Sequence, residues 1–186
     1  MSPRPATATS GLATAASIEP VLRTATLDDL PALRALVERA YRGDTARMGW
    51  THEADLLDDE RTTDEDLVDA ITDRAARVVV LAEACGALVG TVTVTNQGHG
   101  RSYLGMLCVD PAMQAGGMGR RLIKAAERTA RERFGARLME MTVIDSRPEL
   151  IAWYQRRGYV LREEKRAFPV PGEHPFEMVV LENYLD

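Results

Sequence analysis

The sequence predicts a single domain of mixed α/β class, in which helices pack on a β-sheet. Apolar residues make up 45% and charged residues 27% of the 186 residues, which is typical of a globular chain with one sizeable core. Segments rich in β-branched residues alternate with segments whose apolar residues recur at helical spacing. We assign the domain to residues 19–186. Residues 1–18 lack an apolar stretch, so we expect a disordered tail there and not a signal peptide.

The first part of the domain is expected to hold one short strand and two helices. The strand is Val21–Thr24. Thr26 then suits a helix N-cap, and Asp29 favours an approximate capping box. Apolar side chains follow at helical spacing: Leu30, Leu33, Val37 and Tyr41. Residues 42–62 are expected to form an irregular, partly helical excursion, after which Thr63 caps a second short helix.

A run of strands is expected next. Residues 77–83 and 88–95 have the β-branched, alternating pattern of a hairpin, with a turn at Cys85-Gly86. Residues 96–100 are a glycine-rich loop. The strand 103–109 follows, and an Asp-Pro pair ends it.

The last part of the domain alternates helices and strands. A glycine turn leads into a helix that ends at Phe134, where Gly135 supplies the C′ residue. The inward stripe of this helix is Leu122, Ile123, Ala126, Ala130 and Phe134. The remaining elements are a strand, a short helix and two final strands, at residues 138–144, 148–158, 159–163 and 176–181.

Charge and cysteine content narrow the class of function. The formal net charge is −5, and basic residues cluster only locally, in 120–133 and 156–166, so we expect no nucleic-acid partner. Acidic residues gather in 53–73, which suggests a cationic ligand there and an anionic ligand at the basic clusters; solvated helix faces are the alternative. No apolar run is long enough to span a bilayer. Two cysteines and three scattered histidines predict no disulfide framework and no metal, and a reducing cytoplasm is the default.

The segment from Val109 to Arg120 joins a strand to a helix through a glycine-rich turn. Such a turn aims backbone N–H groups at one point, and the helix dipole adds partial positive charge. Glycines let the backbone approach a ligand closely. The sequence therefore predicts a phosphate or pyrophosphate site, to which Arg120, Arg121 and Lys124 could add charge.

Two common phosphate-binding motifs fit this turn poorly. No Lys-Ser or Lys-Thr pair follows the glycines, as a P-loop requires, and the turn lies too late in the chain for a dinucleotide-binding fold. A plain strand-to-helix turn with glycines for packing is the alternative.

Three segments in order resemble the GNAT acetyltransferase superfamily. Residues 114–119 match its Q-x-x-G-x-G signature for coenzyme A (CoA). Residues 107–111 look like its L-x-V-x-P approach, and 150–159 resemble its aromatic-Tyr-x-x-x-Gly-aromatic helix end. The resemblance covers residues 21–181 in element order. Gly49-Trp50-Thr51-His52-Glu53 further resembles a Gly-Trp-Thr-x-Glu stretch of one branch.

The resemblance implies a mixed, mostly antiparallel central sheet, flanked by helices, whose central strands 103–109 and 138–144 splay apart. Acetyl-CoA, as cosubstrate, would lie between these strands, with its pantetheine arm along Leu107 and Val109 and its diphosphate on 114–120. The cofactor-binding residues implied are Leu107, Cys108, Val109, Gln114, Ala115, Gly116, Gly117, Met118, Gly119, Arg120 and Arg147.

The implied reaction is acyl transfer from a thioester to an amine. A backbone N–H near Leu107 or Cys108 would stabilise the oxyanion. Tyr154 stands at the family's tyrosine position and would protonate the leaving thiolate, because a phenol is protonated at neutral pH. A surface tyrosine without a catalytic role is the alternative. Trp153 and Tyr159 are assigned to core packing.

Two positions depart from the family's pattern. Arg147 stands where the family often has Asn, although it could still reach a phosphate of the coenzyme. Residues 102–106 carry no carboxylate, where many members have a Glu as base. Glu140, Glu53 or a water chain could take the proton from the amine instead.

The acceptor side is less well determined. Trp50 and nearby acids could hold an amine by cation–π contact and ion pairing, or Trp50 could be a hydrophobic plug. Residues 168–175, which include His174, could form one pocket wall. We expect an N-acetyltransferase for a primary amine of a small molecule, cytoplasmic and possibly homodimeric. The alternatives are a non-catalytic acyl-CoA-sensing module and a protein N-terminal acetyltransferase.

Overall fold

The computed structural model describes residues 19–42, 61–114, 116–169 and 173–186. The elements in these residues are β1 (Val21–Thr24), η1 (Leu27–Asp29), α1 (Leu30–Tyr41), α3 (Asp64–Thr72), β2 (Ala76–Ala82), β3 (Leu88–Gly98), β4 (Arg101–Val109), η2 (Pro111–Met113), α4 (Met118–Phe134), β5 (Leu138–Ile144), α5 (Pro148–Gln155), β6 (Val160–Arg166) and β7 (Met178–Tyr184). The tail at 1–18 and most of the excursion at 42–62 lie outside the described residues.

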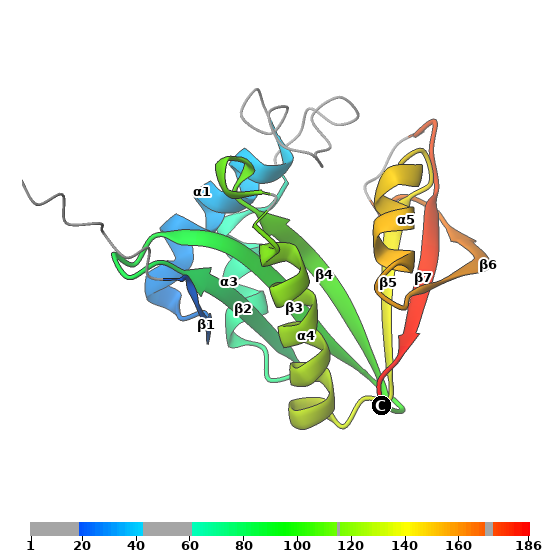
Figure 1. Cartoon of the computed structure of the whole chain (residues 1–186), viewed down its shortest axis with the longest axis horizontal. Coiled ribbons are helices and arrows are strands. Elements are labelled where there is room, and N and C mark those ends of the chain that lie inside the picture. The colour runs from blue at the N-terminus through cyan, green and yellow to red at the C-terminus, as the bar shows by residue number, and fades with distance from the viewer. Residues whose placement is uncertain (1–18, 43–60, 115, 170–172) are drawn as a thin grey trace, which may run out of the picture.

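The seven described strands form one sheet in the order β1-β2-β3-β4-β5-β7-β6. β4 and β5 pair in parallel, and the other neighbours pair antiparallel. Helices flank this sheet, so the mixed, mostly antiparallel α/β fold that the sequence predicted is confirmed (Figure 1).

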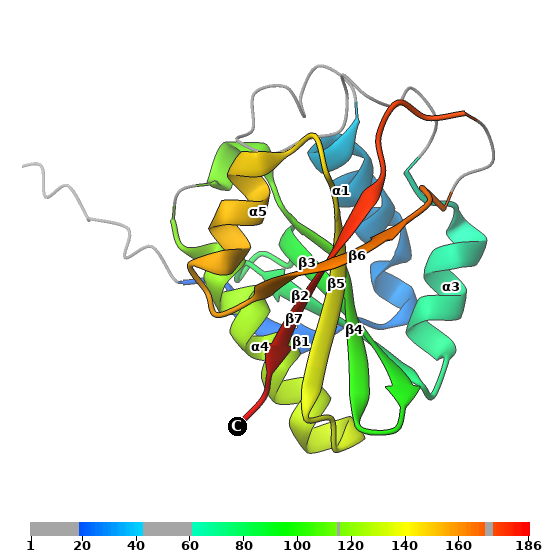
Figure 2. The same ribbon diagram turned by 90° about the vertical axis from the view of Figure 1, so that its right-hand side faces the viewer.

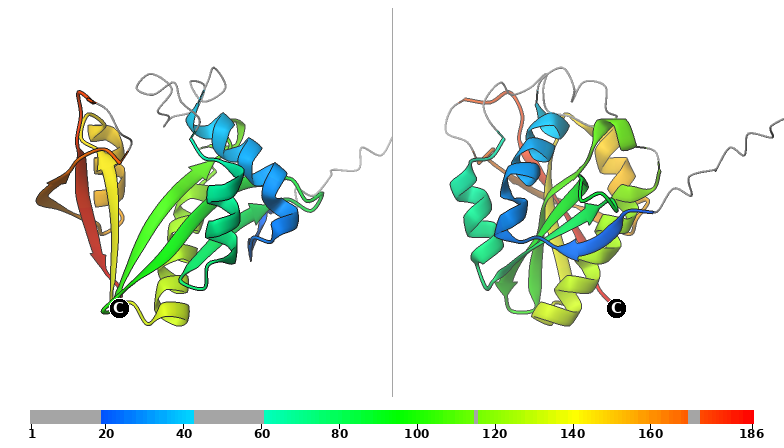
Figure 3. Two further views of the ribbon diagram at one scale, coloured as in Figure 1. Left: turned by 180° about the vertical axis from the view of Figure 1, so that it is seen from behind. Right: turned by 90° about the vertical axis from the view of Figure 1, so that its left-hand side faces the viewer.

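Helices cover both faces of the sheet. α1 and α3 lie on one face and α4 on the other (Figure 3). Side chains of β2 alternate between two cores as a pleated strand requires: Val79 and Leu81 pack with the α4 core, while Val78 and Val80 pack with α1 and α3. α4 approaches β3 closely because Gly90 has no side chain; a Cβ there would lie 2.9 Å from Leu122 Cδ1.

β4 and β5 separate after a short paired stretch. Their register holds for three pairs, the last of which is Tyr103 with Glu140. Beyond that pair, β4 continues on β3 and β5 continues on β7. The sheet therefore opens into a V whose narrow end lies near the start of both strands, which confirms the predicted splay (Figure 1).

Capping residues close in the sequence determine where most of the helices begin and end. The predicted capping box at Thr63 is present, and the α4 helix ends at Gly135 in the left-handed region, with φ 62°. The predicted box between Thr26 and Asp29 is also present, but it opens the 3₁₀ turn η1, and the α-helix starts at Leu30. Pro31 at the start of α1 suits this position because it has no N–H to donate.

Pairing between strands shifts the predicted bounds of one loop and of the last two strands, and one helix ends earlier than expected. The expected loop at 96–100 is shorter, because β3 pairs with β4 as far as Gly98 and a tight turn follows. The last two strands are β6, Val160–Arg166, and β7, Met178–Tyr184, because they pair with each other and β7 also pairs with β5. The helix expected at 148–158 ends at Gln155.

Asp29 ties β1 to the start of α1. Its carboxylate accepts two hydrogen bonds from Arg23, at 2.6 and 2.7 Å, and one from the Thr26 N–H at 2.8 Å. The bonds from Arg23 are the main reason that the pKa of Asp29 falls to about 2. Since this is below the unfolded value of about 3.9, the bonds stabilise the fold above that pH, and their contribution is lost as the pH falls toward 2.

We expect Asp29→Asn to lower the free energy of unfolding by about 1 kcal/mol at pH 7, the usual size for a cap with a partly exposed ion pair. The difference from wild type should shrink as the pH drops below about 4, because the wild-type carboxylate is then progressively protonated. Urea unfolding between pH 7 and pH 3 measures this. Asp28→Asn, an exposed neighbour in the same turn, is the control. If wild type and Asp29→Asn differed in free energy of unfolding by the same amount at every pH, the stabilising role of the Asp29 charge would be contradicted.

Candidate active site

A β-bulge lies in the middle of β4. Thr91 of β3 pairs with Cys108 and Thr93 pairs with Gly105, so Met106 and Leu107 both lie opposite Val92. Met106 adopts φ 47°, which is unusual for a residue with a side chain. The Leu107 carbonyl accepts a hydrogen bond of 2.7 Å from the Tyr41 hydroxyl. Helix α1 therefore helps to hold the bulge, which turns backbone groups of β4 away from the regular ladder.

The splay of β4 and β5 contains a cavity of about 1360 Å³. α4 and α5 lie on one side of these strands, and α1 and α3 lie on the other (Figure 2). Tyr154 lines this cavity. So does every described residue of the predicted cofactor set: Leu107, Cys108, Val109, Gln114, Gly116, Gly117, Met118, Gly119, Arg120 and Arg147. Ala115 lies outside the described residues. The structure thus places these residues around one cavity. Their roles in binding the cofactor remain predictions.

The glycine turn presents the start of α4 to this cavity. Gly117, with φ 76°, is the N-cap residue, and the first intrahelical bond runs from the Arg121 N–H to the Gly117 carbonyl at 3.1 Å. The amides of residues 118–120 precede that bond, so they are available to an anion at the positive end of the helix dipole. This is the geometry that the sequence predicted for a phosphate site.

Asp110 fixes the approach to the turn. Its side chain accepts a bond of 3.0 Å from the Ala112 N–H and forms an ion pair of 2.7 Å with Arg39 of α1. The Asp-Pro pair was expected only to end the strand. The partner lies 71 residues away in the chain, so no local sequence signal could identify it.

Gly119 sets the distance between α4 and α5. A Cβ at this position would lie 3.3 Å from Cζ2 of Trp153, which is tighter than ordinary packing. Trp153 packs against the main core as predicted, and its ring also stacks on the Arg157 guanidinium, with Cζ 3.5 Å from the ring centroid. Trp153 therefore links the glycine turn to the end of α5.

Tyr154 is buried where α5 faces the cavity. Its ring makes edge contacts with Trp153 and Tyr159, at centroid distances of 5.0 and 5.8 Å. Burial raises the pKa of Tyr154 above its ordinary value, and this outweighs the opposite effect of Arg147. The phenol therefore keeps its proton at neutral pH, as a proton donor must.

Cys108 lines the cavity next to the bulge, but it is buried as a thiol. Burial raises its pKa to about 12 and outweighs the lowering effect of Arg61 and Arg39. The thiolate is the nucleophilic form of cysteine, so this raised pKa makes Cys108 a weak nucleophile at neutral pH.

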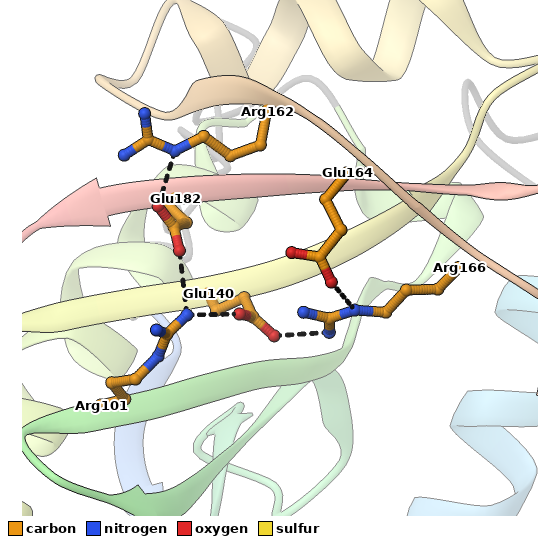
Figure 4. A network of polar contacts seen from close by, with 6 residues as sticks. All are labelled: Arg101, Glu140, Arg162, Glu164, Arg166 and Glu182. Atoms are coloured by element: carbon orange, nitrogen blue, oxygen red, sulfur yellow. Dashed lines mark hydrogen bonds and ion pairs between the residues drawn. The ribbon is translucent and has the colours of Figure 1, made fainter.

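Glu140, expected as a possible base, belongs to the narrow end of the V and does not line the cavity. It is 2% exposed and forms ion pairs with Arg166 of β6 at 2.7 Å and with Arg101 of β4 at 2.8 Å (Figure 4). These bonds, the one from Arg166 first, lower the pKa of Glu140. A carboxylate held so firmly in its charged form by arginines is a poor base, so the structure gives no support to this role. Glu53, the other possible base, and Trp50, expected to contact the acceptor, lie outside the described residues.

Several cavity residues were not singled out from the sequence. The Tyr103 hydroxyl and Thr142 Oγ1 lie 2.7 Å apart and bridge β4 to β5 just beyond their last backbone pair. Six arginines line the described walls, and no described carboxylate does: Arg42, Arg61, Arg120, Arg147, Arg156 and Arg157. The basic clusters in the sequence hinted at part of this set, but Arg42 and Arg61 come from other segments.

The described residues contain no group of three or more His, Cys, Asp and Glu side chains arranged to hold a metal ion. They also contain no helix that combines the length and apolar character needed to cross a bilayer.

Comparison with solved structures shows which proteins share this fold. A spermidine N-acetyltransferase from Vibrio cholerae, in complex with CoA and spermine, has a TM-score of 0.67 at 17% identity and covers 90% of this chain and 96% of its own. The ribosomal-protein-S18-alanine N-acetyltransferase from Escherichia coli has a TM-score of 0.68 at 15% identity, with 90% and 94% covered. A GNAT-family acetyltransferase from Streptococcus pneumoniae has a TM-score of 0.66 at 18% identity, with 89% and 99% covered.

Sequence comparisons give the family. No curated protein sequence matches the chain. A family model described as Acetyltransferase (GNAT) family matches residues 31–159, which include the bulge, the glycine turn and Tyr154. The chain therefore belongs to the GNAT family of acetyltransferases.

Proposed function

We propose that this acetyltransferase uses acetyl-CoA to acetylate a primary amine of a small molecule by direct transfer. The observation that carries the proposal is the single cavity that joins the β4 bulge, the glycine turn before α4 and the buried Tyr154. Each of these features supplies one of the groups that the reaction needs: a donor to the carbonyl oxygen, a diphosphate site and an acid.

The cavity suits an acetyl-CoA molecule in charge and shape. The amides of residues 118–120 and the Arg120 side chain would bind the diphosphate, and Gly117 leaves the approach open: even a Cβ there would meet only the Arg120 guanidinium, at 3.7 Å. The unpaired edge of β4 beyond Tyr103 would bind the pantetheine arm through backbone groups near Leu107 and Val109. Acetyl-CoA supplies the acetyl thioester.

The chain's own groups then account for the transfer. A backbone N–H in the bulge region would stabilise the negative charge that develops on the carbonyl oxygen, an effect worth roughly 3 kcal/mol. The C–N bond forms as the C–S bond breaks. Tyr154 would give its proton to the departing sulfur and recover one from solvent, and the amine would release a proton to water. The neutral Cys108 argues against an acetyl-cysteine intermediate.

The proposal for the acceptor goes no further than a primary amine of a small molecule. The neighbours include enzymes named for spermidine and for a ribosomal protein alanine, but their sequence identities to this chain are 17% and 15%. The described cavity walls carry arginines and no carboxylate to complement a polyamine. We therefore do not extend polyamine specificity to this chain.

A second candidate is a module that binds acyl-CoA without turnover. It is favoured by one observation, namely that no described residue lining the cavity is a carboxylate that could serve as base. A sensing module has no use for a thiol-side acid, so the behaviour of Tyr154 separates the two candidates.

The glycine turn can be tested by ligand-induced stabilisation. Acetyl-CoA should raise the melting temperature of the wild-type protein, because a ligand that binds only the folded state stabilises it. Gly117→Val should abolish this shift, since a branched side chain would disturb the positive φ and crowd the diphosphate approach. Gly86→Val is the matched control: Gly86 also has positive φ, but it lies in the turn between β2 and β3 and does not line the cavity. Equal ligand shifts in both variants would contradict a role for the turn.

Tyr154→Phe should keep acetyl-CoA binding while lowering kcat by about 10²-fold, the usual contribution of a positioned acid. Because the pKa of Tyr154 is raised, wild-type turnover should not decline through loss of this proton between pH 7 and 9. Tyr159→Phe removes the hydroxyl of a buried neighbour that does not line the cavity and serves as control. Unchanged kcat in Tyr154→Phe, measured by thiol release with a panel of amines, would remove the acid role.

Direct transfer predicts that the Cys108 thiol is dispensable. Cys108→Ala should retain thiol release within about tenfold of wild type, because it loses only a few buried contacts. Cys85→Ala, at an exposed position, is the control. An inactive but folded Cys108→Ala protein, together with an acetylated wild-type cysteine found by mass spectrometry after mixing with acetyl-CoA, would show a covalent route instead.

A further inference from the structure

We propose that Arg156 and Arg157, together with Arg120, form a subsite for the phosphate monoester on the ribose of CoA. This subsite would make the protein select CoA thioesters over pantetheine thioesters that lack this phosphate. The inference rests on the proposed function, because it presumes that acetyl-CoA occupies the cavity. It concerns residues at the end of α5 that none of the motifs in the sequence marked as ligand-binding.

The three arginines line the cavity, and Arg120 and Arg156 lie close enough to Arg157 to repel its charge. Arg120 lies in the first turn of α4, where one of its guanidinium nitrogens is 3.7 Å from the place a Cβ of Gly117 would occupy. Arg156 and Arg157 follow α5 directly. Trp153 connects the two groups, since its ring touches Gly119 on one side and stacks with Arg157 on the other.

Contacts with Trp153 fix the position of the Arg157 side chain. Its guanidinium stacks on Trp153 and donates a bond of 2.5 Å to the Trp153 carbonyl. Its Nε is buried and has no partner among the described protein atoms. A fixed guanidinium loses little conformational entropy when it binds a phosphate, and its planar fork matches phosphate oxygens.

The three arginines concentrate positive charge in one place. Among the described residues, no carboxylate forms an ion pair with Arg120, Arg156 or Arg157, whereas Arg147 has Glu149 at 3.3 Å. Burial lowers the pKa of Arg157, and repulsion from Arg156 and Arg120 adds to the effect. An anion at this place would remove the repulsion.

CoA offers these arginines a second anionic group. It carries a diphosphate and, on the ribose of its adenosine, a separate phosphate monoester. The amides of residues 118–120 would bind the diphosphate. Arg156 and Arg157 line the same cavity without a carboxylate partner in the described part of the chain, so they suit the monoester. A donor carried on pantetheine alone, as in a carrier protein, has no group to place there.

The test is a ligand-by-mutation cycle measured by isothermal titration calorimetry in the absence of an amine. The ligands are acetyl-CoA and acetyl-dephospho-CoA, which lacks only the ribose phosphate. The proteins are wild type, Arg156→Gln, the double variant Arg156→Gln/Arg157→Gln, and Arg128→Gln. Arg128 is an exposed arginine of α4 that does not line the cavity, so it controls for the loss of net charge.

We expect wild type and Arg128→Gln to bind acetyl-CoA at least about tenfold more tightly than acetyl-dephospho-CoA, as for charge-assisted hydrogen bonds. In the double variant the ratio of the two dissociation constants should fall close to one. The reason is that acetyl-CoA binds more weakly, whereas the affinity for acetyl-dephospho-CoA does not change. Arg156→Gln should give an intermediate ratio, and it carries the test if the double variant does not fold.

Two results would overturn the inference while leaving the proposed function intact. One is equal binding of the two ligands by wild type. The other is a loss of affinity in the arginine variants that is the same for both ligands, which would place these arginines on the diphosphate. Failure of wild type to bind either ligand would instead overturn the proposed function itself.

Discussion

The fold depends on one constraint: two neighbouring parallel strands must pair at one end and part at the other. β4 and β5 share only three backbone pairs, ending at Tyr103 and Glu140. Beyond these pairs, β4 stays paired with β3 and β5 stays paired with β7. Each strand therefore has one unpaired edge, and these edges face the cavity. An exposed strand edge is normally a liability, because it invites pairing with another chain. Here the same edge is the feature that an extended ligand could use.

The narrow end of the V is held by charged side chains from four strands. Arg101 of β4 reaches both Glu140 of β5 and Glu182 of β7, at 2.8 and 2.9 Å, and Arg162 and Arg166 of β6 bind the same two carboxylates (Figure 4). Burying Glu140 is costly, and the cost is offset only because both of its oxygens are paired. Three backbone pairs alone would make a weak junction between the two halves of the sheet, and this network adds contacts that cross it.

The sequence was most informative where structure follows local rules. Thr63, Gly135 and the glycine turn were placed correctly, because caps and left-handed positions depend on a few neighbouring residues. Ordered motifs then gave the family and, with it, the splay. Features that depend on distant pairing were missed. The bulge puts Met106, a residue with a side chain, at positive φ, and the Tyr41 hydroxyl binds the carbonyl of the next residue, Leu107.

Glu140, one of the candidates for the base, also shows what a residue pattern leaves undetermined. Glu140 was correctly placed on the strand opposite β4. Whether a residue of β5 faces the cavity or the narrow end depends on where the two strands part, and the residue pattern of a single strand does not contain that information. The arginines at the end of α5 were visible as a basic cluster, but only the packing of Trp153 between α4 and α5 relates them to the glycine turn.

Helix α1 holds two segments beside the cavity through separate side chains. Tyr41 binds the Leu107 carbonyl in the bulge, and Arg39 binds Asp110 before the glycine turn. A small rotation of this helix would disturb both places at once. The bulge and the approach to the glycine turn are therefore mechanically coupled through one turn of a helix that precedes them in the chain by 66 and 71 residues.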